Sequence, residues 1–242
     1  GSGRGPFAHG PRLAGRKALA RNLSDIAAMG GLPLAAVGST AFPRGFAQEQ
    51  AREIHAGVQA LAEEFACPLV GGDVGVWDGP LAITITVLGR CGEVEPVLRS
   101  GARAGDAILV TGRLGGAWAS RRHLEFVPRV REGRILAGKY RPHAMIDLSD
   151  GLAGDLRHIC EESKLAAELD AAAIPIHDDV AGSPADRLHA ALSDGEDYEL
   201  LFTLPPDRAD ALQAARDLGV AVTRIGTMCE GEGITLAHAE VP

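Results

Sequence analysis

The sequence predicts a mixed protein of the α/β or α+β class, built from two halves of similar size. Three observations lead to this prediction. Strand-like and helix-like segments alternate in both halves, a polar stretch rich in Gly and Pro separates them at 92–106, and 242 residues are enough for two domains of about 100 to 150 residues each. We therefore expect an N-terminal domain over 12–91 and a C-terminal domain over 92–242.

The N-terminal half predicts two helices and three strands. The segment 15–31 carries Leu19, Leu23 and Ile26 at helical spacing and ends at two glycines, which are typical of a helix terminus. A second helical stripe follows at 49–65. The other segments are predicted strands, of which the second is short, buried and ends in a Gly-Gly-Asp turn. These strands are 33–42, 67–73 and 79–91.

The C-terminal half continues the alternation. A strand and a glycine turn come first, and then a strand, a Ser-Asp-Gly turn and an amphipathic helix. A short strand, a helix, an acidic turn and another strand follow, and a helix and a strand close the chain. The corresponding segments are 107–116, 143–163, 167–176, 184–205, 206–219 and 220–228.

The composition narrows the class of protein. Hydrophobic residues make up 46% and charged residues 23% of the chain, as in ordinary soluble globular proteins. A formal net charge of -8 argues against a nucleic-acid partner. The four cysteines show no metal-ligand spacing, no apolar run is long enough for a membrane span, and no signal peptide is evident, so we expect a cytoplasmic protein. The initial Gly-Ser-Gly resembles an expression remnant.

Acidic residues recur at strand ends and turns, often beside Gly. Carboxylate oxygens without histidine suit Mg²⁺ shared with nucleotide phosphates, and Gly lets backbone approach a phosphate closely. Singly, each is more often a turn residue, and Asp150 could simply cap the helix that follows it. Asp147 is harder to explain, because a carboxylate that ends an apolar strand needs a partner. Both a metal-phosphate site and ordinary turns remain open for Asp25, Asp73, Asp147, Asp150, Glu196 and Asp197.

The motifs of the commonest nucleotide enzymes are absent from this sequence. It contains no P-loop, no glycine-rich dinucleotide fingerprint after a strand and no protein-kinase signature. The basic segment 120–134 is interpreted as a solvated helix face, and His158 is expected to have no catalytic role. Arg99 differs, because it lies at the expected domain junction, where a guanidinium could bind a triphosphate with two hydrogen bonds.

A family resemblance is carried by seven segments that follow one another in a fixed order. They are KALARNLSDIAAMGGLPLAA, LVGGD, PLAITITVLGR, LRSGARAGDAILVTGRLGG, HLEFVPRV, AMIDLSDGLAGDL and SDGEDYELLFT. From Leu13 to Met228 the chain resembles the thiamine-monophosphate kinase family, within the aminoimidazole-ribonucleotide synthetase superfamily. Selenophosphate synthetase and a hydrogenase-maturation dehydratase belong to the same superfamily. The run NLSDIAAMG together with GEDYELLF favours the thiamine enzymes.

This resemblance implies an activity and a set of partners. The γ-phosphoryl group of ATP would pass directly and in line to thiamine monophosphate, with Mg²⁺ assisting, to give thiamine diphosphate. The implied fold has two domains, of which the N-terminal half forms a sheet or barrel with the second subunit of a homodimer. Two alternatives remain: another ATP-using enzyme of the superfamily, like selenophosphate synthetase or a ribonucleotide cyclo-ligase, or a truncated form without catalysis.

The resemblance also implies a role for individual residues, with positioning and metal electrostatics in place of a dedicated catalytic side chain. Metal ligands would be Asp25, Asp73, Asp147 and Asp150. The nucleotide would contact Gly72, Asp73, Arg99 and Ser149, and Glu196 would lie in the thiamine-phosphate pocket.

Some features depart from the family pattern. A Gly-Asp-Asp segment and a Thr-Thr-Asp strand that supply further metal ligands upstream of the first helix are not found, nor is a C-terminal aromatic wall for the substrate. We therefore expect the first strands of the N-terminal domain to be missing. Asp194 replaces a usual Gly in the acidic turn, which predicts strain if its φ is positive. Asp155, in the first helical turn after Asp150, is expected to be a bystander favoured by the helix dipole.

Overall fold

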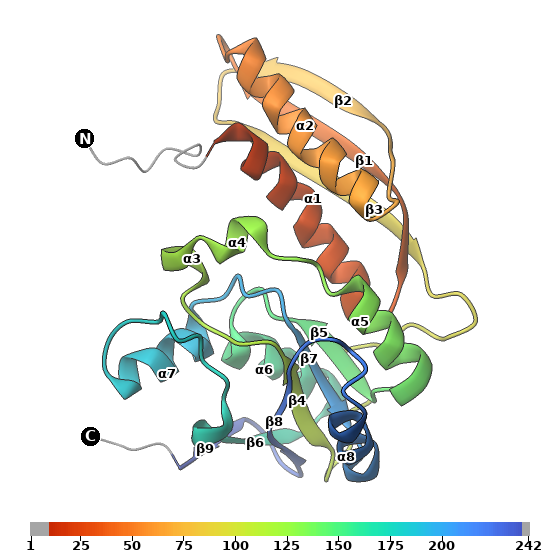
Figure 1. Cartoon of the computed structure of the whole chain (residues 1–242), viewed down its shortest axis with the longest axis vertical. Helices are drawn as coiled ribbons and strands as arrows, with labels where there is room; N and C mark the ends of the chain where they lie inside the picture. The colour runs from red at the N-terminus through yellow and green to blue at the C-terminus, as the bar shows by residue number, and fades with distance from the viewer. Residues whose placement is uncertain (1–9, 239–242) are drawn as a thin grey trace.

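The computed structural model describes residues 10–238, which form two regions joined by helix α1 (Figure 1). The N-terminal region is a three-stranded sheet with α1 (Pro11–Ala28) and α2 (Gln48–Glu64) packed together on one side of it. Its strands are β1 (Leu32–Pro43), β2 (Leu69–Trp77) and β3 (Ala82–Arg90), in the order β2-β1-β3. Strand β1 pairs parallel with β2 and antiparallel with β3.

The C-terminal region contains a six-stranded sheet in the order β5-β7-β4-β8-β6-β9. All neighbouring strands are antiparallel except β6 and β9, so the region is of the α+β type. The strands are β4 (Ala107–Thr111), β5 (Ala144–Asp147), β6 (Ala166–Asp170), β7 (Leu200–Leu204), β8 (Val222–Cys229) and β9 (Ile234–Ala237). The long helices are α6 (Leu152–Ser163), α7 (Pro184–Ser193) and α8 (Pro206–Ala215).

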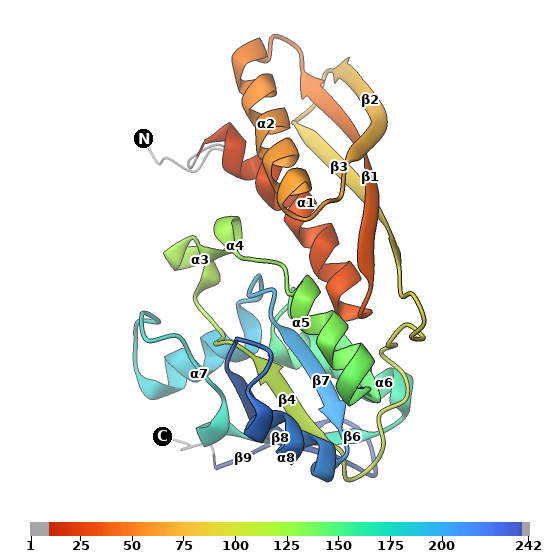
Figure 2. The ribbon, with the colours of Figure 1, turned by 45° about the vertical axis from the view of Figure 1, so that its right-hand side comes forward.

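Between β4 and β5 the chain forms a series of short helical turns, where the sequence predicted only one helix face over 120–134. They are α3 (Ala117–Ser120), α4 (Arg122–Glu125), α5 (Val130–Ile135) and the π-helix η1 (Leu136–Tyr140); a 3₁₀ turn, η2 (Ala171–Ala173), follows β6. Figures 1 and 2 show this series running along α1, with α5 against the end of α1 nearest the C-terminal sheet. The division into separate turns has no sequence signal, because each turn is too short to show a periodic apolar stripe.

The remaining predicted helices and strands are present, with two corrections. Strand β2 is not a short buried strand that ends in a turn: it runs through Asp73 to Trp77 as an exposed sheet-edge strand, extended where the Gly-Gly-Asp sequence suggested a turn. Gly72 lies so close to β1 that a Cβ there would be 1.8 Å from the Gly38 carbonyl oxygen. Asp194 is not strained, since its φ is -68°, and the positive φ values fall instead on Gly195, Glu196 and Tyr198.

Both faces of the C-terminal sheet are buried. Alternate residues of β7 point to opposite sides, so that Phe202 joins one hydrophobic cluster and Leu201 another. The Phe202 cluster also contains Leu19 and Leu23 of α1, which have no exposed surface. Helix α1 is therefore part of the core of both regions. The segment 92–106 separates the two regions along the chain, but their hydrophobic cores are continuous. No helix of the described residues is long and apolar enough to cross a membrane.

Helices α1 and α2 pack closely because each presents a glycine to the other. A Cβ on Gly57 would lie 1.9 Å from the Arg12 carbonyl oxygen, and one on Gly15 would lie 1.9 Å from the Ile54 carbonyl oxygen. A methyl group at either position would force the helices apart.

We predict that Gly57→Ala lowers the free energy of unfolding by about 1 to 3 kcal/mol through overpacking, although Ala favours an isolated helix by about 1 kcal/mol. Urea unfolding followed by circular dichroism measures this. Gly138→Ala in η1 is the matched control, because no atom lies within 4 Å of the added Cβ. A Gly57→Ala variant as stable as the parent protein would show that the two helices are not held at this distance.

Candidate active site

Two loops of the C-terminal region form one backbone unit. The loop after β5, with the sequence LSDG, pairs with the loop before β7, with the sequence DGEDYE. The Leu148 N–H donates to the Glu199 carbonyl, and the Tyr198 N–H donates to the Leu148 carbonyl, both at 2.8 Å. The Glu196 N–H donates to the Ser149 carbonyl, also at 2.8 Å. Two acidic motifs that are far apart in the sequence therefore lie side by side.

Helix α1 contacts this unit at two points, the last residue of β5 and the loop before β7. The Ser24 hydroxyl donates to Asp147 Oδ2 at 2.7 Å, and the Lys17 ammonium forms an ion pair with Glu196 Oε2. Lys17 and Ser24 are seven residues apart, so they lie on one face of the helix with about 10 Å of axial rise between them. Asp25, the next residue, lines a cavity beside this face. We call the side of the site with Asp25 and Asp147 the aspartate end, and the side with Glu196 the glutamate end.

At the aspartate end lies a cavity of about 450 Å³ whose wall includes Asp25, Arg99 and Asp147. Burial raises the pKa of Asp147 to about 6, while its hydrogen bond from Ser24 acts in the opposite direction and the nearby Asp25 adds to the rise. Desolvation also raises the pKa of Asp25, although the positive charges of Arg21 and Arg99 oppose this shift. Two carboxylates that repel one another in a cavity favour a bound cation.

The donor set fits a magnesium ion. The side chains that the aspartate end offers are carboxylates, without the histidine and cysteine ligands that select zinc or copper. Asp150 follows in the same loop and is exposed, and Ser149 is half-buried between the two. Of the predicted site residues, the structure therefore brings Asp25, Arg99 and Asp147 to one cavity, with Ser149 and Asp150 on the adjoining loop.

Asp155 is not the bystander that the sequence suggested. It is 2% exposed and accepts the backbone N–H groups of Ser149 and Asp150 at 2.9 and 3.0 Å. Burial raises its pKa to about 6 despite these bonds. The sequence could not show this role, because it does not reveal that the loop at Ser149 and Asp150 folds back toward the side chain of Asp155 in the first turn of α6. Asp155 fixes the shape of the Ser-Asp turn.

Gly72 and Asp73 lie apart from this group. They are in the middle of the edge strand β2, where Asp73 pairs with Ser39 of β1. Asp73 lines a separate groove between the sheet and α2, together with Arg52 and His55. Within one chain, the predicted nucleotide-binding residues are thus divided between the domain junction and β2.

At the glutamate end, Glu196 has partners that the sequence analysis missed. The Tyr198 hydroxyl donates to its Oε2 at 3.1 Å, and the Lys17 ammonium lies 2.8 Å from His123 Nδ1 and 4.8 Å from the centre of the Trp118 ring. In the sequence, Lys17 is marked only by its place in the first of the seven segments that carry the family resemblance.

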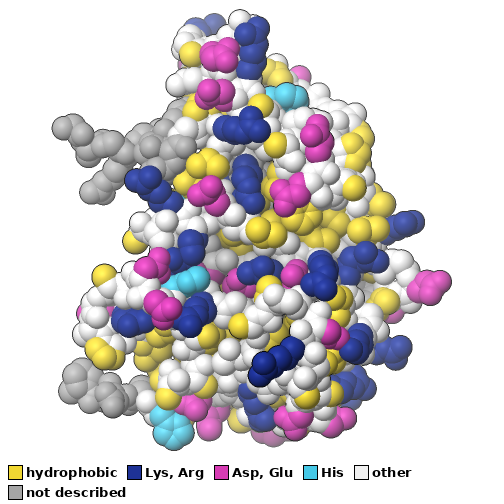
Figure 3. Space-filling view, in the orientation of Figure 1, with side chains coloured by type: hydrophobic (Ala, Val, Ile, Leu, Met, Phe, Trp, Pro, Cys, Tyr) yellow, Lys and Arg dark blue, Asp and Glu magenta, His cyan; other side chains and the backbone are white. Residues whose placement is uncertain are grey.

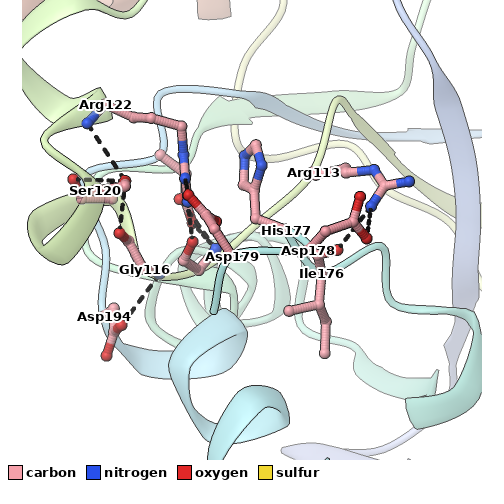
Figure 4. A network of polar contacts seen from close by, with 12 residues as sticks. Arg113, Gly116, Ser120, Arg122, Ile176, His177, Asp178, Asp179 and Asp194 are labelled. Atoms are coloured by element: carbon pink, nitrogen blue, oxygen red, sulfur yellow. Dashed lines mark hydrogen bonds and ion pairs between the residues drawn. The ribbon is translucent and has the colours of Figure 1, made fainter. Parts of the chain in front are cut away.

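The basic segment 120–134 is a solvated face only in part: Arg121, Arg131 and Arg134 are exposed, whereas Arg122 and Arg129 are half-buried. Arg129 forms two hydrogen bonds with the Glu199 carboxylate, at 2.8 and 2.5 Å, and Thr111 donates to the same carboxylate at 2.5 Å. Arg122 pairs with Asp179 and donates to the Gly115 carbonyl at 2.6 Å (Figure 4). These arginines attach the helical turns between β4 and β5 to the sheet, so their charges serve structure.

The other acids of the DGED turn are also structural. The Gly116 N–H donates to Asp194 at 3.2 Å (Figure 4), and the Gly115 N–H donates to both oxygens of Asp197 at 3.0 and 2.9 Å. Burial raises the pKa of Asp197 to about 7. Asp197 was one of the candidate site residues, and the structure gives it the task of holding the glycine loop after β4.

This chain is similar to known proteins over most of its length. The family model described as the AIR synthase related protein, N-terminal domain, matches residues 3–91, and that of the C-terminal domain matches residues 103–239. The thiamine-monophosphate kinase of Rhodopirellula baltica is 42% identical over 224 residues, which cover 91% of this chain and 70% of that protein. The chain belongs to the thiamine-monophosphate kinase family.

Other members of the family are similar over most of the chain. The Bacillus subtilis kinase is 33% identical over 91% of this chain and 74% of its own length. The Aquifex aeolicus thiamine monophosphate kinase structure is 29% identical with a TM-score of 0.83, covering 96% of this chain and 82% of that one. A structure described as AaThiL complexed with AMPPCP and TMP gives the same identity and TM-score, with coverage of 96% and 78%. The hydrogenase maturation protein HypE, at 21% identity and a TM-score of 0.77, shares the fold.

The buried carboxylates of this kinase family member predict a pH effect on its stability. Burial raises the pKa of Asp147 from 3.8 to about 6, so the folded state holds the proton more tightly than the unfolded state. Below pH 4 both states are protonated; stability is then lost as the pH rises to 6, because the unfolded state loses its proton first.

We expect Asp147→Asn to raise the free energy of unfolding of the metal-free protein by about 1 to 3 kcal/mol at pH 8 and to change it little below pH 4. Thermal unfolding in the presence of a chelator, at both pH values, measures this. Asp78→Asn, in an exposed pair with Arg44, is the control, with a change of less than about 1 kcal/mol. An equal gain at both pH values would assign the effect to packing instead of charge.

Proposed function

We propose that this protein is an ATP- and Mg²⁺-dependent thiamine-phosphate kinase, which converts thiamine monophosphate and ATP to thiamine diphosphate and ADP. One observation carries the proposal: a structure with AMPPCP and TMP bound matches 96% of this chain at a TM-score of 0.83. The identity of 42% with the Rhodopirellula baltica kinase supports it independently. We also propose a cytoplasmic location, in keeping with four free cysteines.

The reaction needs charge neutralisation and alignment more than proton transfer. The bond between the γ-phosphorus and the oxygen that joins it to ADP breaks, and a bond forms to an oxygen of the acceptor's phosphate. That oxygen is already an anion near neutral pH, so no general base is required, which agrees with the absence of a dedicated catalytic side chain in our reading. Mg²⁺ would supply the positive charge that lets the two anionic reactants approach.

The residues divide the work between the two ends of the site. Asp25, Asp147 and Asp150 would hold the metal ions, and the cavity beside them would receive the nucleotide phosphates, with Arg99 as a cationic partner and Ser149 on the adjoining loop. Glu196, in the loop before β7 that pairs with the loop after β5, would contact the thiamine moiety, and the acceptor's phosphate would point toward the metal ions.

A direct assay tests the proposal. Thiamine diphosphate should form from thiamine monophosphate and ATP in the presence of Mg²⁺, as measured by chromatography.

We predict that Asp147→Asn lowers turnover by at least about 100-fold while retaining the fold, because one of the charges that holds the metal is lost. Near-parental turnover in this variant would remove Asp147 from the metal site. ADP release with other acceptors only would instead favour another activity of the superfamily.

We further propose that the protein is a homodimer joined through the three-stranded sheet. The sheet exposes large apolar side chains, part of which Figure 3 shows at the edge of the N-terminal region. They include Val37, Val70, Val74, Val76, Trp77 and Leu88, of which Val74 is 71% exposed. Three strands also leave two unpaired edges, which a second sheet could cover. Gly72 and Asp73 of β2 would then lie close to the subunit interface.

We predict that Val74→Glu converts the dimer to a monomer of 25.2 kDa, because it places a charge in the apolar contact. Light scattering coupled to size-exclusion chromatography measures the mass. Val127→Glu is the control, since Val127 is also exposed, at 51%, but lies outside the sheet. A parental protein that elutes as a monomer would contradict the proposed dimer.

A further inference from the structure

Lys17 is half-buried at the domain junction, and the proposed reaction has so far given it no role. Its side chain is 14% exposed, and its ammonium group contacts groups from three different segments: the Glu196 carboxylate, His123 Nδ1 at 2.8 Å and the face of the Trp118 ring at 4.8 Å. An ammonium group can only donate hydrogen bonds, so His123 Nδ1 is the acceptor. The ion pair with Glu196, the hydrogen bond to His123 and the contact with the Trp118 ring together restrict the position of the ammonium group.

The contacts of Glu196 fall on one of its two oxygens. Within residues 10–238, Lys17 and the Tyr198 hydroxyl both meet Oε2, and His123 Nδ1 lies 3.9 Å from the same atom. Oε1 is therefore the oxygen left to accept a hydrogen bond from a ligand. The backbone of Glu196 has a φ of 62°, an uncommon conformation for a residue with a side chain. The direction of the carboxylate is thus fixed by its partners as well as by the chain.

We propose that Lys17 is a positioning residue for the acceptor substrate, an inference that rests on the proposed function. It holds Oε2 of Glu196 and so aims Oε1 at the thiamine moiety, whose amino group and positively charged ring attract a carboxylate oxygen. A carboxylate would repel the phosphates, so Lys17 acts on recognition of the thiamine moiety and leaves the nucleotide unaffected.

The position of Lys17 on α1 gives this contact a second consequence. Ser24, two turns along the same helix face, donates to Asp147 at the aspartate end. Because α1 is a straight element packed in the core of both regions, it sets the distance between the group that aims at the acceptor and the groups that would hold the metal ions. Lys17 and Ser24 are the polar contacts of α1 at the two ends of the site.

The test compares Lys17→Met with Lys17→Arg in steady-state kinetics. For Lys17→Met we expect KM for thiamine monophosphate to rise about tenfold, with KM for ATP and kcat each within about threefold of the parental values, as for loss of one charge-assisted hydrogen bond at the acceptor. Lys17→Arg keeps the positive charge and should restore most of the acceptor KM. Lys17→Gln replaces Lys17→Met if the latter does not fold.

Two further variants sharpen the assignment. Lys139→Met is the matched control, because Lys139 also pairs with a carboxylate, that of Asp217, and lies 5.0 Å from the centre of the Tyr140 ring, outside the site; it should leave all three constants unchanged. In the double variant of Lys17→Met and Glu196→Gln, the rise in acceptor KM should be less than the product of the two single effects, since both act through one carboxylate.

The outcomes separate the two proposals. If the parental protein forms no thiamine diphosphate, the proposed function fails. If it does, an unchanged acceptor KM in Lys17→Met overturns the positioning role. An equal loss in the constants for both substrates would do the same, because it would mean that Lys17 only supports the fold.

Discussion

The burial of one helix between two sheets is the constraint on which the rest of this structure depends. Leu19 and Leu23 of α1 have no exposed surface and belong to the same hydrophobic cluster as Phe202 of the C-terminal sheet. Apolar packing therefore fixes the rotation and axial position of α1. The polar residues on the other face of the helix are placed as a consequence. That face places Lys17 against one loop residue and Ser24 against another. Packing in the core thus decides the geometry of the site.

The carboxylates at the junction reduce stability for the sake of a function. Asp147 and Asp155 are buried and Asp197 is half-buried, and desolvation raises the pKa of each. Two of them serve the loop geometry directly, since Asp155 holds the Ser-Asp turn and Asp197 holds the glycine loop after β4. Asp147 has one hydroxyl partner and a cavity beside it. This arrangement is the one that the metal site we propose would need.

The charged residues of the surrounding turns have a structural role. Arg129 and Arg122 lie in the segment of helical turns between β4 and β5; Arg129 pairs with Glu199, just before β7, and Arg122 pairs with Asp179, in the loop between η2 and α7. Arg113, in the glycine loop itself, pairs with Asp178 at 2.5 Å (Figure 4). These pairs fix the glycine loop and the helical turns against the body of the protein. The turns carry Trp118 and His123, so the same pairs also define the surroundings of Lys17.

The sequence by itself determined most of the helices and strands, the family and the residues of the two acidic loops, because these depend on apolar periodicity, turn chemistry and local motifs. It set Asp147 apart as a candidate ligand but took Asp155 for a bystander, and only the fold shows that Asp155 holds two backbone N–H groups while Asp147 lies beside a cavity. It also could not find Lys17 as the partner of Glu196, or Arg129 as the partner of Glu199. Contacts between distant segments are decided by the packing of α1 and the sheet, and that packing has no local signature in the chain.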